Sequence, residues 1–145
     1  MAQAPKPLKS FYSCLDTRFI KEVPQPLQHV VIAHFVASLG GTVVFYTMED
    51  VYSCDSHEVI LGKVLEKPRI DGFVFFRIAQ FYNGGRPNIE FLRMMLEHGY
   101  EVHFAREKIS LRTAADLDRV FPIVFTAHFL EGRDEGHAFS LSVPR

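Results

Sequence analysis

The sequence has no tryptophan, only two cysteines and no apolar run near the about 18 residues that a transmembrane helix needs. Residues 1–7 contain no apolar core of the kind that a signal peptide carries. Cys14 and Cys54 are isolated, and the seven histidines lack the spacing of a zinc site. We therefore expect a cytoplasmic protein with reduced thiols, no metal, no cofactor and no membrane partner.

No charge of one sign dominates, since 16 Lys and Arg residues oppose 17 Asp and Glu residues and leave a net charge of -1. A nucleic-acid binder usually carries a basic surplus, so we expect no nucleic-acid partner. What the chain does have is 48% hydrophobic residues over 145 positions, which favours one globular domain. We expect a flexible N-terminus over residues 1–7, a single α/β domain over 8–130, and a tail or late edge strand over 131–145.

Strand and helix patterns alternate along the chain. β-branched, aromatic or continuous apolar residues predict four strands, at residues 8–14, 42–47, 70–76 and 100–105. Helical spacing of apolar residues predicts four helices, from Pro24 to Leu39, from Ser53 or Asp55 to Leu65, over 87–98, and over 113–130 with a break at Pro122. Residues 77–86 are predicted to form a loop, and the alternation at 137–143 fits a late edge strand.

The first predicted helix begins with Pro24 and Pro26, because proline is tolerated in a first helical turn, and Gly40-Gly41 ends it. Its apolar stripe is expected to face the sheet. The stripe consists of Leu27, Val30, Val31, His34, Phe35 and Leu39.

The strand–helix unit repeats at about 30 residues, the size of a βαβ crossover. Right-handed crossovers give a three-layer αβα fold with a mostly parallel sheet of four to five strands, in the order 2-1-3-4. That order has a topological switch between strands one and three. Ligands of open α/β sheets bind at such a switch, beyond the carboxyl ends of the strands.

Polar residues follow the carboxyl ends of the predicted strands. Arginine offers a bidentate donor fork, so a phosphate or carboxylate anion fits this edge. We expect Arg77 to clamp the anion, and Gln80 and Glu49 to bond hydroxyl groups. Polar loops at strand ends also account for these residues without any ligand. The full set of expected ligand-binding residues is Ser13, Arg18, Glu49, Arg77, Gln80 and Arg106. This set is flanked by four further residues, Cys14, Asp16, Asp50 and Tyr82.

Glu107 and His103 are the candidate proton-transfer groups, although a histidine inside a strand is more often a satisfied core residue. Ser13 or Cys14 as a nucleophile would need a base within hydrogen-bond reach, and the sequence places none. The sequence leaves open whether the chain is an enzyme.

The last predicted helix carries aromatic residues on one side and apolar residues on another. Phe121, Phe125 and Phe129 recur at every fourth position, beside Val120 and Ile123. A helix that is apolar on more than one side is deeply buried or forms a subunit contact. We therefore expect a homo-oligomer.

Four segments resemble the sporadic carbohydrate cluster proteins, a small bacterial family found among surface-carbohydrate biosynthesis genes. The family pattern Ile-His-Phe-Ala-x-Glu reads Val102-His-Phe-Ala-Arg-Glu107 in this chain. The resemblance extends over about residues 10–130. It implies a cellular setting, surface-carbohydrate biosynthesis, but no catalytic mechanism. The other three segments are Val23-Pro-Gln-Pro-Leu-Gln-His-Val-Val-Ile32, Met48-Glu-Asp and Ile70-Asp-Gly-Phe-Val74.

The order of elements is also similar to the catalytic domain of serine recombinases. Those enzymes carry Tyr-x-Arg-Val-Ser on strand one and Asp-Arg-Leu-x-Arg after strand three. Strand one here reads Phe11-Tyr-Ser-Cys-Leu15, with neither the arginine nor the serine in register. In the later motif Arg77 matches, and Gln80 replaces the second arginine. The resemblance implies a resolvase-like fold without recombination, because the reaction needs the serine and several arginines.

Together these observations predict an accessory protein or small enzyme of bacterial surface-carbohydrate biosynthesis. It would bind an anionic sugar-related metabolite, a sugar phosphate or nucleotide sugar, at the carboxyl edge of the sheet. A non-catalytic module that docks through its aromatic C-terminal helix is the alternative. A diverged phosphodiester-cleaving enzyme is a third.

Overall fold

A computed structural model of the chain describes residues 8–47, 62, 66, 69–83 and 86–122. Its main sheet has five strands in the order β2-β1-β3-β6-β7. The first four are parallel, and β7 runs antiparallel to β6. The strands are β1 (Lys9–Cys14), β2 (Gly41–Thr47), β3 (Gly72–Phe75), β6 (Glu101–Phe104) and β7 (Ile109–Leu111).

This sheet confirms the predicted α/β class and the order of the four predicted strands. The fifth strand, β7, was not predicted. It forms because the chain reverses directly after β6, with Lys108 at a φ of 59° in the turn. The expected N-terminal segment 1–7, most of the helix expected over residues 53–65 and the late strand 137–143 lie outside the described residues.

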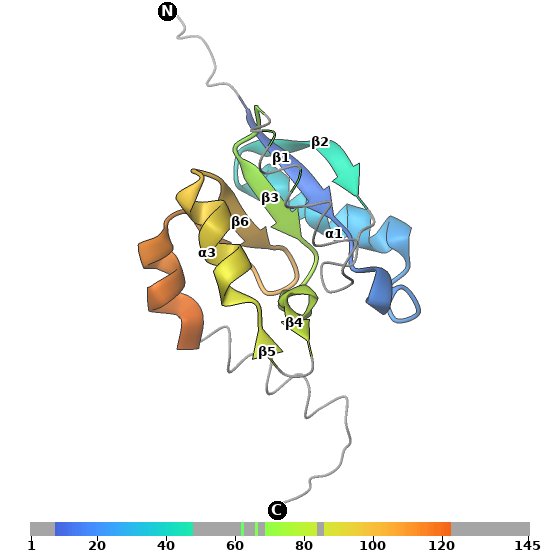
Figure 1. Cartoon of the computed structure of the whole chain (residues 1–145). Coiled ribbons are helices and arrows are strands. Elements are labelled where there is room, and N and C mark those ends of the chain that lie inside the picture. The colour runs from blue at the N-terminus through green and yellow to red at the C-terminus, as the bar shows by residue number, and fades with distance from the viewer. Residues whose placement is uncertain (1–7, 48–61, 63–65, 67–68, 84–85, 123–145) are drawn as a thin grey trace, which may run out of the picture.

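Two helices cover opposite faces of the sheet and make three layers (Figure 1). Helix α1 (Gln25–Ser38) packs on the face that carries Phe11 and Val74. Helix α3 (Ile89–Glu97) packs on the other face, against Tyr12 and Phe73. Successive strand residues alternate between the two cores, as the pleat of a strand requires.

The buried face of α1 differs from the predicted stripe. Gln28, Ile32, Phe35 and Val36 are buried, whereas four residues of the expected stripe, Leu27, Val30, Val31 and His34, are exposed. The helix is apolar on every side, so apolar spacing alone does not identify the side that meets the sheet. The exposed fractions of Leu27, Val30 and Val31 are 55%, 63% and 37%.

The segment predicted as a loop over residues 77–86 contains regular structure. A 3-10 helix, η2 (Ile78–Phe81), is followed by the short antiparallel strands β4 (Tyr82–Asn83) and β5 (Arg86–Pro87). Ile78 and Phe81 are buried, so apolar anchors hold this connection on the core of α3.

The helix predicted over 87–98 is confirmed as α3, whose first turn is capped by the Asn88 side chain. Residues 114–122 are helical, and the rest of the predicted helix over 113–130, with Phe125 and Phe129, lies outside the described part. Among the helices that the structure describes, none is long and apolar enough to cross a membrane.

Candidate functional site

The connections that follow β1 and β3 meet at a buried ion pair. Asp16 lies just beyond β1 and Arg77 just beyond β3, and the Arg77 Nε lies 2.5 Å from Oδ2 of Asp16. The Asp16 side chain is wholly buried, and the Arg77 side chain is 9% exposed. The Arg77 guanidinium carbon lies 3.7 Å from the centre of the Phe19 ring. Phe19 belongs to the short 3-10 helix η1 (Thr17–Phe19). Arg77 therefore has an anionic partner within the chain.

Gln80 ties the same two connections together. Its Nε2 lies 3.2 Å from the carbonyl oxygens of both Cys14 and Leu15 and donates to them. Its Oε1 accepts a hydrogen bond of 3.0 Å from the backbone N–H of Arg77. Both ends of the amide are thus occupied by backbone groups, so Gln80 positions the two connections. It was expected instead to bond ligand hydroxyls.

Gln28 of α1 is a second buried amide, and it was not among the expected site residues. Its Oε1 accepts from the Asp16 N–H at 2.8 Å. Its Nε2 donates to the carbonyl oxygens of Asp16 at 3.1 Å and Val23 at 2.9 Å. The signal in the sequence was a glutamine among the apolar residues of a helix. These bonds fix Asp16 and also decide which side of α1 faces the sheet.

Arg18 and Arg106 bring two more guanidinium groups to this edge, and both residues are exposed. Arg18 donates to the Ala79 carbonyl oxygen at 2.8 Å, and its backbone N–H donates to Oδ1 of Asp16. The Arg106 guanidinium carbon lies 5.1 Å from the centre of the Phe19 ring. Phe19 is therefore the point near which Arg77 and Arg106 converge, with Arg18 one residue before it.

Glu107 was expected to transfer protons, and it supports the backbone of η2. Its Oε1 accepts a 3.1 Å hydrogen bond from the Ile78 N–H. This bond joins the turn between β6 and β7 to the connection after β3.

His103 lies inside β6 and is completely buried. Its Nδ1 is 2.7 Å from the Ser110 Oγ, and its Nε2 is 2.8 Å from Oε1 of Glu101. The rings of Phe11 and Phe35 pack against it, with centroids 5.2 and 6.0 Å away. Burial lowers the pKa of His103, against the opposing effect of the bond to Glu101. The core-histidine interpretation is confirmed.

Ser13 is wholly buried in β1, and its Oγ has no hydrogen-bond partner in the part of the chain that the structure describes. A hydroxyl without a base is not an activated nucleophile. Cys14 is buried as well. Tyr82 is also buried, and burial raises its pKa to about 12. Glu49, Asp50 and Cys54 lie outside the described residues.

Within the described ranges, no group of three His, Cys, Asp or Glu side chains could hold a metal ion.

No family model matches this chain, and no curated protein matches it. The chain is similar to a solved structure, the crystal structure of a resolvase family site-specific recombinase from Streptococcus pneumoniae. The TM-score is 0.59 and the identity 12%, with 89% of this chain and 90% of that chain covered. This similarity shows a resolvase-like α/β fold, as expected from the order of elements.

Proposed function

We propose that this chain is a protein-interaction domain on a resolvase-like fold that pairs with a second copy of itself through strand β2. One observation carries the proposal. Strand β2 lies at the edge of the described sheet and exposes three consecutive large apolar residues. An exposed apolar edge strand is a template for pairing with another strand. The exposed fractions are 42% for Val44, 51% for Phe45 and 60% for Tyr46.

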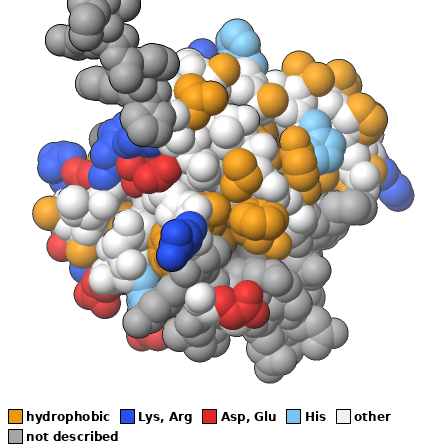
Figure 2. Space-filling model, turned by 90° about the horizontal axis from the view of Figure 1, so that it is seen from above, with side chains coloured by type: hydrophobic (Ala, Val, Ile, Leu, Met, Phe, Trp, Pro, Cys, Tyr) orange, Lys and Arg blue, Asp and Glu red, His pale blue; other side chains and the backbone are white. Residues whose placement is uncertain are grey.

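Neighbouring rings hold the two aromatic side chains at this edge. The Phe45 ring packs on Tyr12 of β1 at a centroid distance of 5.7 Å, and the Tyr46 ring packs on His29 of α1 at 5.0 Å. Hydrophobic side chains gather in one part of the face drawn in Figure 2, with a histidine among them. A partner strand at β2 would meet apolar surface on both faces of the sheet.

A second copy is the partner that the chemistry of β2 favours. The strand sequence Gly41-Thr-Val-Val-Phe-Tyr-Thr47 has no charged residue and no proline, the features with which edge strands usually prevent pairing. Two β2 strands related by a two-fold axis would place the same apolar side chains opposite each other, which gives a self-complementary interface. A net charge of -1 adds little repulsion between copies.

The solution mass of the protein tests this proposal. We expect wild type to be a dimer by light scattering and Phe45→Lys to have the 16.6 kDa mass of one chain. Leu27→Lys is the matched control, because Leu27 is similarly exposed, at 55%, but lies on α1. A monomeric wild type, or a Phe45→Lys variant that still dimerises, would contradict the proposal. Thermal unfolding of each variant confirms that it is folded.

The cellular setting that we propose is surface-carbohydrate biosynthesis in the bacterial cytoplasm, in which the chain serves as an accessory protein. This rests on the resemblance of its segments, including Val102-His-Phe-Ala-Arg-Glu107, to the sporadic carbohydrate cluster proteins.

Binding of an anionic sugar-related metabolite at the carboxyl edge is a second candidate function. The convergence of Arg77 and Arg106 near Phe19 favours it. Because the Arg77 side chain is buried, the exposed Arg18 and Arg106 would make the first contact with an anion. We expect a sugar phosphate or nucleotide sugar to raise the melting temperature of wild type and not of Arg106→Ala. Equal shifts for both proteins would reject this site.

The departure of this chain from the recombinase motif argues for a function other than phosphodiester cleavage. Counted from Tyr12, the arginine and serine positions of Tyr-x-Arg-Val-Ser fall on Cys14 and Asp16. A buried carboxylate bonded to Arg77 thus occupies the position of the nucleophile in this register. A carboxylate in a buried ion pair is a structural group, and cleavage by the recombinase mechanism needs an attacking serine hydroxyl.

A further inference from the structure

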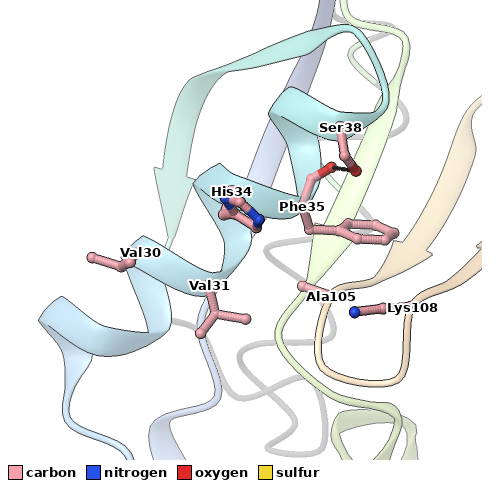
Figure 3. Close-up of a pocket in the computed structure, with 7 residues that line it drawn as sticks. All are labelled: Val30, Val31, His34, Phe35, Ser38, Ala105 and Lys108. Carbon is pink, nitrogen blue, oxygen red and sulfur yellow. Dashed lines mark hydrogen bonds between the residues drawn. The ribbon is translucent and has the colours of Figure 1, made fainter.

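We infer that a pocket between α1 and the turn from β6 to β7 binds a small amphipathic carboxylate, a molecule with an apolar body and one negative charge. The pocket has a volume of about 390 Å³ (Figure 3). This lies within the roughly 300–1,000 Å³ of small-molecule sites. It is lined by Val30, Val31, His34, Phe35, Ser38, Ala105 and Lys108.

The walls of the pocket are apolar. Val30 and Val31 of α1 form one side, although they are exposed and contribute nothing to the core. Phe35 and Ala105 are buried and connect the pocket to the core below α1. Ser38 adds little polarity, because its hydroxyl already donates to the Phe35 carbonyl oxygen at 2.6 Å. An apolar chain would therefore displace water from these walls.

Lys108 supplies the positive charge. In Figure 3 its amine points from the turn toward α1. The residue has a φ of 59°, a left-handed conformation that costs free energy for any residue with a side chain. Glycine or asparagine would fit this turn position at lower cost. The lysine at this position brings an ammonium group to the mouth of an apolar pocket.

The charge of the lining selects an anion, and its apolar character selects an amphipathic one. Lys108 is accompanied by His34, and no acidic residue occurs among the described residues that line the pocket. A hydrophilic sugar would leave its hydroxyls without partners on Val30, Val31 and Phe35, which disfavours its binding. A short alkyl carboxylate satisfies both the walls and the ammonium. This inference does not depend on β2, which contributes no lining residue.

Calorimetric titration with octanoate, and with octanamide as its neutral counterpart, tests the inference on the full chain. We expect saturable octanoate binding to wild type and about tenfold weaker binding of octanamide, because the charge-assisted hydrogen bond is lost. Val31→Asp places a negative charge in the pocket wall and should abolish octanoate binding.

Variants at Lys108 separate the charge from the fold. Lys108→Gly removes the ammonium and relieves the positive φ, so it should fold at least as well as wild type while binding octanoate about tenfold more weakly. Lys108→Arg should retain binding, and Lys21→Ala, a change at an exposed lysine outside the pocket, should leave it unchanged. Absent or non-saturable binding to wild type, or equal octanoate affinity of wild type and Lys108→Gly, would overturn the inference.

Discussion

Oδ2 of Asp16 accepts a hydrogen bond from Nε of Arg77 at 2.5 Å, and both side chains are buried where the connections after β1 and β3 meet. The other carboxylate oxygen of Asp16 accepts the Arg18 N–H at 3.0 Å. Burying two charges costs free energy unless both are paired and hydrogen-bonded, and here the required partners are present. The pair therefore stabilises the switch point of the sheet, and its loss should appear as a loss of stability.

Removing one partner of the pair should destabilise the fold strongly. We expect Arg77→Met to lower the free energy of unfolding by about 3–5 kcal/mol, because Asp16 is then a buried charge without its guanidinium. Urea unfolding measures this change. The double variant Asp16→Asn/Arg77→Met should lose less than the sum of the two single variants. A loss below about 1 kcal/mol for Arg77→Met would mean that solvent reaches Asp16.

The buried amide of Gln28 should also be essential to the fold. Gln28→Leu removes the acceptor of the Asp16 N–H and the donor to two carbonyl oxygens. We expect the free energy of unfolding to fall by about 2–3 kcal/mol, since buried backbone groups are left without partners. Gln25→Leu, in the first turn of the same helix but half-buried, is the control and should change stability by under about 0.5 kcal/mol. Equal effects of the two variants would refute this role.

The strands and their order were predictable, because βαβ alternation and the handedness of crossovers leave few topologies. The side chains at the switch point were predictable as a group, but their pairing was not. Sequence places Arg77 and Gln80 at the correct edge, and only coordinates show that Asp16 and backbone carbonyls already occupy them. The buried side of α1 was mispredicted because every side of that helix is apolar.

Gly72 should resist substitution because two strands approach closely there. A Cβ on Gly72 would lie 2.2 Å from the backbone oxygen of Glu101, its partner on β6. We expect Gly72→Ala to destabilise the protein by about 1–3 kcal/mol or more, since the strands must separate. Thermal unfolding measures the loss.

Gly40→Ala gives the contrasting case for Gly72→Ala. No atom lies within 4 Å of a Cβ at Gly40, whose φ is +76°. Only backbone strain of about 1 kcal/mol is expected there. If Gly72→Ala proves no more harmful than Gly40→Ala, the contact between β3 and β6 is looser than the structure shows.

The stability of the fold should fall as the pH drops below the ordinary pKa of histidine. Burial of His103 between Phe11 and Phe35 lowers its pKa from the usual 6.5, although the hydrogen bond to Glu101 acts in the opposite direction. The unfolded chain therefore takes up the proton at a higher pH than the folded chain. The stabilisation is complete above 6.5 and is lost as the pH falls through the lower pKa of the folded state.

Urea unfolding from about pH 8 to about pH 5 measures this dependence. We expect His103→Gln to be less stable than wild type at neutral pH and to lose less stability on acidification, because glutamine takes up no proton. Burial alone would raise the pKa of Glu101, but its hydrogen bonds to Lys9 and His103 lower it below 4.5. The contribution of Glu101 to the stability of the fold is therefore lost only at more acidic pH. His34→Gln, at an exposed position, should keep the wild-type slope. A slope that His34→Gln removes and His103→Gln retains would show that another histidine is responsible.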